Sequence, residues 1–294
     1  MPTLDWHLPH DRRLTLDATA VMGVLNLTPD SFSDGGRFAD VDAAVAEGLA
    51  MAAAGAAVID VGGESTRPGA DRIAPDEQSR RVVEPIRRLR RTLDTTGHQA
   101  VAISIDTTRA QVASAALDAG AAIVNDVSAG RDDDAMLPAV AERQAPIVLM
   151  HMLGQPATMQ ADPRYDEPGG VVEAVERFLL DRAAAAQAAG IPGDRIALDP
   201  GIGFGKTTEH NRALLAALPR LVALGHPIVL GASRKRFLAA ASPATAANPA
   251  DRLAGTCVVS AWAARCRVAL VRVHDVAPNR QAVDVQRWLE RNFV

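Results

Sequence analysis

The sequence has few of the residues that build covalent or metal-based frameworks. Its 294 residues include only 2 cysteines, Cys257 and Cys266, which lie in an apolar stretch. Neither cysteine has a Cys or His partner at zinc-finger spacing, and a disulfide framework needs more of them. We therefore expect both to be free, buried thiols, as suits a protein kept in a reducing cytosol.

The chain also lacks a membrane-spanning run, a signal peptide and an excess of positive charge. The apolar region from Leu253 to Val271 is broken by Arg265 and Arg267, so it would make a poor membrane span. The first residues do not place an apolar core after a basic head, as a secretory signal does. The formal net charge is −4, whereas a nucleic-acid-binding surface is usually basic. We expect a cytoplasmic protein without nucleic-acid or membrane partners.

What the sequence does contain is an alternation of short apolar runs with helical segments. Hydrophobic content is 48% and charged content 22%, which is typical of a soluble globular domain. Buried parallel strands are predicted near residues 21–26, 56–61, 101–105, 121–125, 146–150, 195–199, 227–231 and 268–273. Helices are predicted near residues 41–54, 77–93, 108–119, 133–143, 170–189, 207–218, 248–265 and 277–292.

Residues typical of helix ends flank several of these segments. Three glycines follow predicted helices, where a left-handed residue is favoured: Gly55, Gly120 and Gly190. Four side chains are predicted to cap helix N-termini: Asp42, Thr107, Asp132 and Thr207. The final helix carries Val283, Trp288 and Leu289 on nearby turns, and this pattern predicts a face turned to the core.

Eight strands alternating with eight helices predict an α/β fold of one domain, a closed (β/α)8 TIM barrel. The barrel is expected to span residues 21–294, and residues 1–20 are expected to form a cap segment, a short strand or hairpin over the barrel bottom. A doubly wound open sheet is the rival, but its polar strand ends would gather at one switch point. Here polar residues recur at the ends of successive strands: Asn26, Asp60, Asp106, Asn125, His151, Asp199, Ser233 and His274.

Basic residues are expected to gather where the seventh and eighth strands end. The segment 231–236 reads Gly-Ala-Ser-Arg-Lys-Arg and opens a short helix. Strand eight supplies Arg272 and His274, which share one face because they alternate with Val273. Barrels often bind phosphate at this place. In the alternative interpretation, the arginines of 231–236 are solvated and Lys235 only caps the helix.

Hydrogen-bond acceptors stand at the ends of three other strands. Asp106, Asn125 and Asp199 each end a buried apolar run, and such groups can pair with the N–H edge of a planar heterocycle. The alternative is that each caps a helix or binds loop backbone. Asp126 follows Asn125 and points to the opposite side, so we expect it to cap its loop.

Two glycine-rich loops, residues 30–36 and 66–69, suit lids that close on a substrate, although ordinary surface loops would read similarly. The long connections 27–40, 62–75 and 152–168 also favour functional loops. The segment 201–206 lacks the spacing of a phosphate-binding P-loop. His151 and His210 have no partner at zinc-site spacing, so we interpret them as structural or peripheral.

The motifs occur in a fixed order over nearly all of residues 20–293, at 22–36, 60–69, 104–107, 125–127, 150–152, 198–206, 231–235 and 272–275. In this they resemble the dihydropteroate synthases, a family of pterin-binding barrels. The resemblance implies that a dihydropterin carrying a hydroxymethyl diphosphate loses pyrophosphate to the amine of 4-aminobenzoate. It implies the cofactor Mg²⁺, no covalent enzyme intermediate, and a homodimer formed through the late helices.

The resemblance also assigns roles to residues. The catalytic residues would be Asp106, Lys235 and Asp199. The pterin diphosphate would be bound by Thr66, Asp106, Asn125, Asp199, Lys235, Arg272, Val273 and His274. The aminobenzoate would be bound by Phe32, Thr66, Arg67, Pro68, Phe204 and Lys235. The lids would carry Ser31, Asp34 and Gly69, and Asn26 would contact the metal.

One departure from the family pattern bears on the site, because Arg236 follows Lys235 where many members have Ser. Two alternative functions stay open. A pterin-binding methyltransferase that works with a corrinoid protein would share the pterin-holding residues but would not need the basic cluster. A paralogue that binds a pterin without turnover would keep the residues and release no pyrophosphate.

Overall fold

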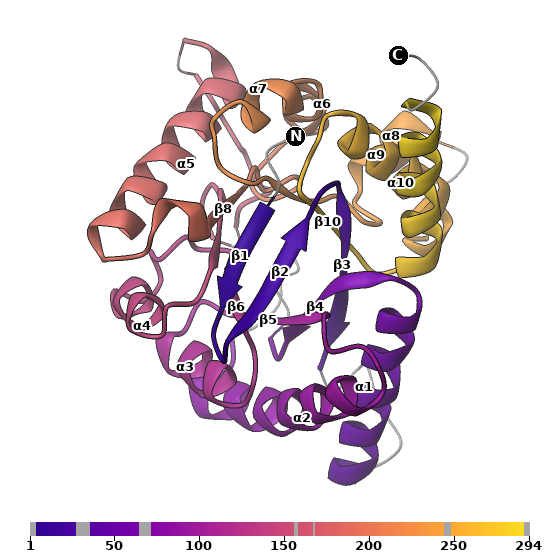
Figure 1. Ribbon diagram of the computed structural model, residues 1–294. Helices are drawn as coiled ribbons and strands as arrows, with labels where there is room; N and C mark the ends of the chain where they lie inside the picture. Colours follow the sequence, from indigo (N-terminus) through magenta and orange to yellow (C-terminus); the bar gives the residue numbers. More distant parts are fainter. Residues whose placement is uncertain are drawn as a thin grey trace.

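The computed structural model describes residues 4–27, 36–64, 72–155, 158–166, 168–243 and 248–290, with only the backbone for 36–40. Eight parallel strands line a barrel and helices surround it (Figure 1). The strands are β3 (Ala20–Asn26), β4 (Ala56–Gly62), β5 (Ala102–Asp106), β6 (Ile123–Asp126), β7 (Ile147–Met150), β8 (Ile196–Asp199), β9 (Val229–Gly231) and β10 (Leu270–Val273).

The strand order β8-β7-β6-β5-β4-β3-β10-β9 runs once around the barrel. Leu198 forms a parallel bridge with Ile228, and its N–H donates to the carbonyl of Pro227 at 2.9 Å. These contacts join β8 to β9 and close the sheet. The predicted (β/α)8 barrel is confirmed, and the open doubly wound sheet is excluded.

The helices pack around the outside of the barrel (Figure 1). They are α1 (Gly36–Ala53), α2 (Pro75–Thr95), α3 (Ala110–Asp118), α4 (Met136–Glu142), α5 (Gly170–Ala188), α6 (Thr208–Ala216), α7 (Leu218–Val222), α8 (Phe237–Ala241), α9 (Leu253–Arg265) and α10 (Val276–Glu290). Short 3₁₀ turns stand at η2 (Gly193–Arg195) and η4 (Ala250–Arg252). No helix in these described ranges has the length and apolar character that crossing a membrane would require.

The predicted helix 207–218 corresponds to α6, which ends at Ala216, and a separate helix, α7, follows it from Leu218 to Val222. Pro219 has no N–H to donate to the carbonyl of Leu215, four residues earlier. The indole N–H of Trp262 takes that carbonyl instead, at 2.8 Å. The chain therefore restarts as a separate helix at Leu218.

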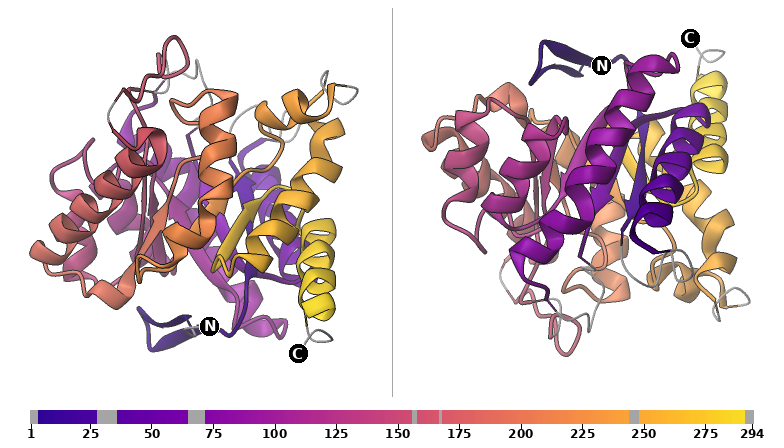
Figure 2. Two further views of the ribbon diagram at one scale, coloured as in Figure 1. Left: turned by 90° about the horizontal axis from the view of Figure 1, so that it is seen from above. Right: turned by 90° about the horizontal axis from the view of Figure 1, so that it is seen from below.

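The N-terminal segment forms a hairpin across the bottom of the barrel, as expected (Figure 2). Strands β1 (Leu4–Leu8) and β2 (Arg12–Leu16) pair antiparallel. Trp6 is fully buried, and its indole N–H donates to the carbonyl of Asp194 at 2.8 Å. The apolar residues of the hairpin pack against the barrel interior through Met22 and Val58. The hairpin thus seals the end of the barrel where the parallel strands begin.

The predicted helix ends were partly right. Gly55, Gly120 and Gly190 have φ of 93°, 114° and 101°, the left-handed conformation expected after a helix. Thr207 caps α6, because its hydroxyl accepts the N–H of His210 at 3.2 Å.

The other three predicted caps were wrong, because contacts distant in sequence take these side chains. Asp42 lies inside α1 and pairs with an arginine of α2. The hydroxyl of Thr107 donates to Gln78 at 3.0 Å, and α3 starts only at Ala110. Asp132 pairs with Arg72, and α4 starts at Met136.

Two predictions about burial were also wrong in part. Val283 is fully buried, but Trp288 is 61% exposed and Leu289 is 43% exposed. At 3.6 residues per turn, Trp288 lies about 140° around the helix from Val283, which takes it off the buried face. Both cysteines are free, but only Cys266 is buried, whereas Cys257 is partly exposed.

Candidate active site

The barrel interior changes from apolar to polar along the strands. Near the hairpin the inward side chains are apolar, as with Val58, Ala102 and Ala197. Side chains two residues apart on a strand share a face, so the next inward positions are Asp60, Ser104, Asn125, Asp199 and Arg272. The polar layer therefore lies at the end of the barrel where the strands finish.

Arg272 lies between two carboxylates in this layer. Its Nε donates to Asp60 Oδ2 at 2.6 Å, and its Nη2 donates to Asp106 Oδ2 at 2.6 Å. Asp60 Oδ2 also accepts the Asn125 amide N–H at 3.0 Å. The structure thus joins the predicted residues Asp106, Asn125 and Arg272 in one network. At its centre is Asp60, which is fully buried and was not among the predicted site residues.

The network shifts the charge states of its members. Burial raises the pKa of Asp106 to about 7; Arg272 opposes this shift and Asp60 adds to it. Burial alone would lower the pKa of Arg272, but the two carboxylates outweigh it and raise that pKa. Arg272 therefore stays charged, whereas Asp106 titrates near neutral pH.

Asp199, Lys235 and Phe204 lie at or after the ends of β8 and β9, which follow β10 around the barrel. Asp199 Oδ1 accepts the N–H of Gly201 at 2.7 Å. Lys235 Nζ donates to the carbonyl of Ile202 and lies 4.4 Å from the centre of the Phe204 ring. Burial lowers the pKa of Lys235 to about 8, with Asp199 opposing the shift. Burial raises the pKa of Asp199, and Lys235 opposes that.

The other basic residues near β9 and β10 are divided between the mouth and the outside. Ser233 Oγ lies 3.0 Å from Nδ1 of His274, at the end of β10. Arg234 instead pairs with Asp275, and Arg236 is exposed. Val273 is buried in the core between sheet and helices, opposite in direction to Arg272.

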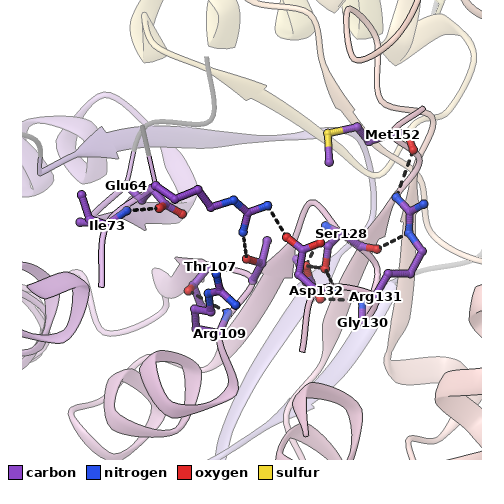
Figure 3. A network of polar contacts seen from close by, with 12 residues as sticks. Glu64, Ile73, Thr107, Arg109, Ser128, Gly130, Arg131, Asp132 and Met152 are labelled. Carbon is purple, nitrogen blue, oxygen red and sulfur yellow. Dashed lines mark hydrogen bonds and ion pairs between the residues drawn. The ribbon is translucent and has the colours of Figure 1, made fainter. Parts of the chain in front are cut away.

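Polar contacts tie together the loops around the mouth (Figure 3). Glu64 accepts the N–H of Ile73 at 2.8 Å. Asp126 accepts the N–H groups of Ser128 and Gly130 at 2.7 and 2.6 Å, so it caps its loop as predicted. In Figure 3 the Arg131 side chain reaches from the loop after β6 to the carbonyl of Met152, after β7, at 3.0 Å.

Residues 22–274 match the model of a family described as pterin binding enzymes. The chain belongs to this family. It is 49% identical over 282 residues to dihydropteroate synthase of Mycobacterium leprae, covering 94% of this chain and 95% of the relative. It also matches dihydropteroate synthase of Xanthomonas albilineans solved with 4-aminobenzoic acid, with TM-score 0.88, 44% identity and 99% of both chains covered. The same enzyme solved with 7,8-dihydropteroate matches with TM-score 0.82, 42% identity and 100% of both chains covered.

In this pterin-binding enzyme, sequence reasoning also missed a buried pair beside the site. Lys206 Nζ lies 2.9 Å from His151 Nδ1 and donates to the carbonyl of Phe204 at 3.0 Å. Burial lowers the pKa of Lys206 well below its usual value. Burial, with Lys206 second, lowers the pKa of His151 to about 2, so its ring stays neutral. The pair holds the loop that carries Phe204. In the sequence, the only signal for this pair was the position of His151 at the end of a strand.

Seven predicted site residues lie outside the described part of the chain: Ser31, Phe32, Asp34, Thr66, Arg67, Pro68 and Gly69. Among the residues that the structure does describe, no three His, Cys, Asp or Glu side chains gather as a metal-binding group. His210 caps α6 and His151 binds Lys206, in line with their interpretation as structural residues.

Proposed function

We propose that this protein forms 7,8-dihydropteroate and pyrophosphate from 4-aminobenzoate and a dihydropterin that carries a hydroxymethyl diphosphate. It is an enzyme, a transferase of folate biosynthesis. The observation that carries the proposal is one barrel mouth in which the acceptors Asp106, Asn125 and Asp199 stand beside the cations Lys235 and Arg272. Such a mouth suits a ligand with an N–H-rich ring at one end and an anion at the other.

The pterin ring would lie against Asp106, Asn125 and Asp199. Carboxylate and amide oxygens can accept the N–H groups of its guanidine-like edge. Asp106 Oδ1 is buried and accepts no hydrogen bond within the described residues, so it has acceptor capacity left for a ligand. The same carboxylates would stabilise positive charge on the pterin methylene as its bond to the diphosphate breaks.

The diphosphate would be held by Lys235, Arg272 and His274. Lys235 and Arg272 carry the positive charge that a pyrophosphate leaving group needs, and the pKa of Arg272 keeps it protonated. As the C–O bond breaks, the bonding electrons leave with pyrophosphate. The amine of 4-aminobenzoate then bonds to the methylene and loses a proton. This path requires no covalent nucleophile from the protein.

Mg²⁺ would be held in the mouth through a single protein contact, Asn26. Asn26 ends β3 beside Gly62; a Cβ built on Gly62 would lie 3.6 Å from Asn26 Oδ1, so this oxygen faces the barrel interior. One amide oxygen is a sparse ligand set, but Mg²⁺ keeps several waters and binds substrate phosphates. Once bound, the ion would neutralise charge on the diphosphate leaving group.

The aminobenzoate would pack its ring against Phe204 and direct its carboxylate toward Lys235. Phe204 is partly buried against Met150, Met152 and Met159, which gives it an apolar backing. The remaining proposed contacts, Phe32, Thr66, Arg67 and Pro68, come from the family resemblance alone. If the loops complete this half of the site only after the first substrate binds, 4-aminobenzoate should bind more tightly in the presence of pyrophosphate and a pterin.

The proposal is tested by following pyrophosphate release from dihydropterin diphosphate and Mg²⁺, with and without 4-aminobenzoate. We expect release with formation of dihydropteroate only when the amine is present. Pterin binding without any release would instead favour the non-catalytic paralogue, and methyl transfer from a methylated pterin would favour the corrinoid-linked methyltransferase.

A prediction from Gly231 tests where the ligand lies. A Cβ on Gly231 would lie 3.8 Å from Asp199 Oδ2 and 4.0 Å from Arg272 Cβ, which are ordinary contacts. The protein alone should therefore tolerate Gly231→Ala, with little change in melting temperature. A pterin between Asp199 and Arg272 would meet the new methyl group, so we expect its Kd to rise about tenfold, in the range of a steric misfit of 1–3 kcal/mol.

The control for Gly231→Ala is Gly225→Ala, at a surface turn far from the mouth, where nothing lies within 4 Å of the added carbon. Gly225 has φ of 86°, so this variant should lose some stability and keep its pterin affinity. Unchanged affinity in Gly231→Ala, measured by calorimetric titration, would place the ring elsewhere.

A second prediction concerns pH. Binding of the diphosphate substrate needs Asp106 charged, which requires a pH above about 7. It also needs Lys235 charged, which requires a pH below about 8. The profile of kcat/KM reports the free enzyme, so it should be bell-shaped with its maximum between these values. Lys235→Arg should move the alkaline limb upward, because arginine stays charged; a flat profile from pH 6 to 9 would contradict both assignments.

We also propose a homodimer in the cytoplasm. Five large apolar side chains on α9 and α10 are exposed: Val258, Trp262, Val285, Trp288 and Leu289. The two helices lie side by side on the outside of the barrel (Figure 1). Exposed apolar patches of this kind often mark the surfaces through which proteins interact. Sedimentation at micromolar concentration tests the proposal.

A further inference from the structure

Asp60 is a buried carboxylate that the proposed chemistry does not use. It has no exposed surface, and it pairs in register with Ser104, two residues before Asp106 on the same strand. It therefore lies one inward position, about 6.6 Å along the strands, before the level of Asp106, and it is bonded to Asn125 and Arg272. A side chain at this depth acts on the substrate only through its neighbours.

We propose that Asp60 is a positioning residue that sets both ends of the pterin diphosphate site, by fixing the amide of Asn125 and the guanidinium of Arg272. The proposal rests on the proposed function, since it assigns the ring to Asn125 and the diphosphate to Arg272. Its physical basis is that one oxygen, Asp60 Oδ2, accepts hydrogen bonds from both side chains.

The contact with Asn125 decides which end of the amide faces the ligand. A carboxylate has no proton to donate, so the amide must present Nδ2 to Asp60, as it does at 3.0 Å. The Asn125 oxygen is then left on the side of the mouth, where it can only accept. Asp60 thereby makes Asn125 a hydrogen-bond acceptor for the N–H groups of the ring.

The contact with Arg272 provides a fixed pivot. The Nε bond to Asp60 is 2.6 Å long and lies at the base of the guanidinium. The terminal nitrogens extend beyond it, and only Nη2 is engaged by a described residue, Asp106. When the pterin takes Asp106, Arg272 can exchange that partner for the diphosphate while Nε stays on Asp60. Without Asp60, the Arg272 guanidinium would lose the hydrogen bond that fixes its position.

Asp60→Asn is the test, because it keeps the shape and removes the charge. The variant should fold, since asparagine keeps the shape of the side chain and its oxygen can still accept the Nε–H of Arg272. An asparagine can also turn its N–H toward Asn125 and invert that amide. We expect Kd for an oxidised pterin lacking phosphate, and Kd for pyrophosphate with Mg²⁺, each to rise about 10- to 100-fold. KM for 4-aminobenzoate should change less than twofold.

Asp126→Asn is the matched control. Asp126 is equally buried at a strand end, but its carboxylate only binds the backbone of its own loop and Ser128. We expect it to lower the melting temperature while both Kd values stay within twofold. If Asp60→Asn does not fold, Asp60→Ser is measured in its place.

The proposal is overturned if the Asp60 variant binds both ligands within twofold of the wild type. It is also overturned if only one ligand weakens, because the positioning would then not be shared. Both ligands can be titrated without turnover. A wild-type protein that binds them but makes no dihydropteroate would refute the proposed function and leave the test of Asp60 intact.

Discussion

Replacing Lys235 by alanine is expected to lower kcat/KM for the dihydropterin diphosphate by about 100- to 1,000-fold, the usual effect of removing one preorganised charged donor. Lys235 reaches the mouth between the carbonyl of Ile202 and the ring of Phe204, with Asp199 as its nearby counter-charge. No other ammonium among the described residues is aimed at the mouth, because Lys206 is bound to His151 behind the Phe204 loop.

The fold should survive the loss of Lys235. Folding depresses the pKa of this group from 10.5 to about 8, so the folded state binds its proton less well than the unfolded chain does. Below pH 8 the charged lysine therefore opposes folding, and Lys235→Ala should melt at the same or a higher temperature at pH 7. Steady-state kinetics and thermal melts measure the two effects separately.

The control for Lys235→Ala is Arg236→Ala. Arg236 is the exposed neighbour on the same segment, and its loss should change kcat/KM no more than twofold. A larger effect would make Arg236 a contact for the aminobenzoate carboxylate, at the position where this chain departs from its family. Activity near that of the wild type in Lys235→Ala would refute the assignment of the anion site.

The strands could be predicted because burial on both faces of a strand favours apolar residues. The runs ending in Asn125 and Asp199 are continuously apolar, and only Ser104 interrupts the run ending in Asp106; such runs are typical of strands that are buried on both faces. The order of the barrel then followed from right-handed βα connections. Local signals were enough wherever the deciding contacts were also local, as with Thr207 and its own first helical turn.

Prediction failed where a partner distant in sequence decided the outcome. The N–H of Ala110, at the start of α3, is accepted by Asp133 of the following loop at 2.9 Å, so no residue before α3 needed to cap it. Asp60 was noticed as a strand end, but its role depends on Arg272, 212 positions away. Arg272 was expected to bind a diphosphate, and the sequence did not indicate that it also pairs with two buried carboxylates.

Replacing Arg272 by methionine is expected to lower the free energy of unfolding by about 3–5 kcal/mol at pH 8, as breaking one side of a buried ion pair does. The side chain is only 22% exposed, and its partners Asp60 and Asp106 are 0% and 7% exposed. Methionine fills the aliphatic space but leaves two buried carboxylates without their cation. Pterin turnover should also fall at least 100-fold, because the diphosphate loses a charged donor.

The pH dependence of the stability lost in Arg272→Met identifies the cause of this loss. Arg272 lowers the pKa of Asp106 against the effect of burial, so its removal raises that pKa further. A carboxylate with a raised pKa binds its proton more tightly in the folded state, and stability falls as the pH rises through the folded value. Urea titrations should therefore show a large deficit at pH 8 and a small one at pH 5.5.

Two further variants separate the charge from the packing. Arg234→Met breaks the more exposed pair with Asp275 and should cost about 1 kcal/mol or less at either pH. Adding Asp60→Asn to Arg272→Met should restore part of the stability at pH 8 without restoring turnover, since it removes one uncompensated charge but supplies no donor for the diphosphate. An Arg272→Met deficit that is equal at both pH values would show that lost packing, rather than unpaired carboxylates, accounts for it.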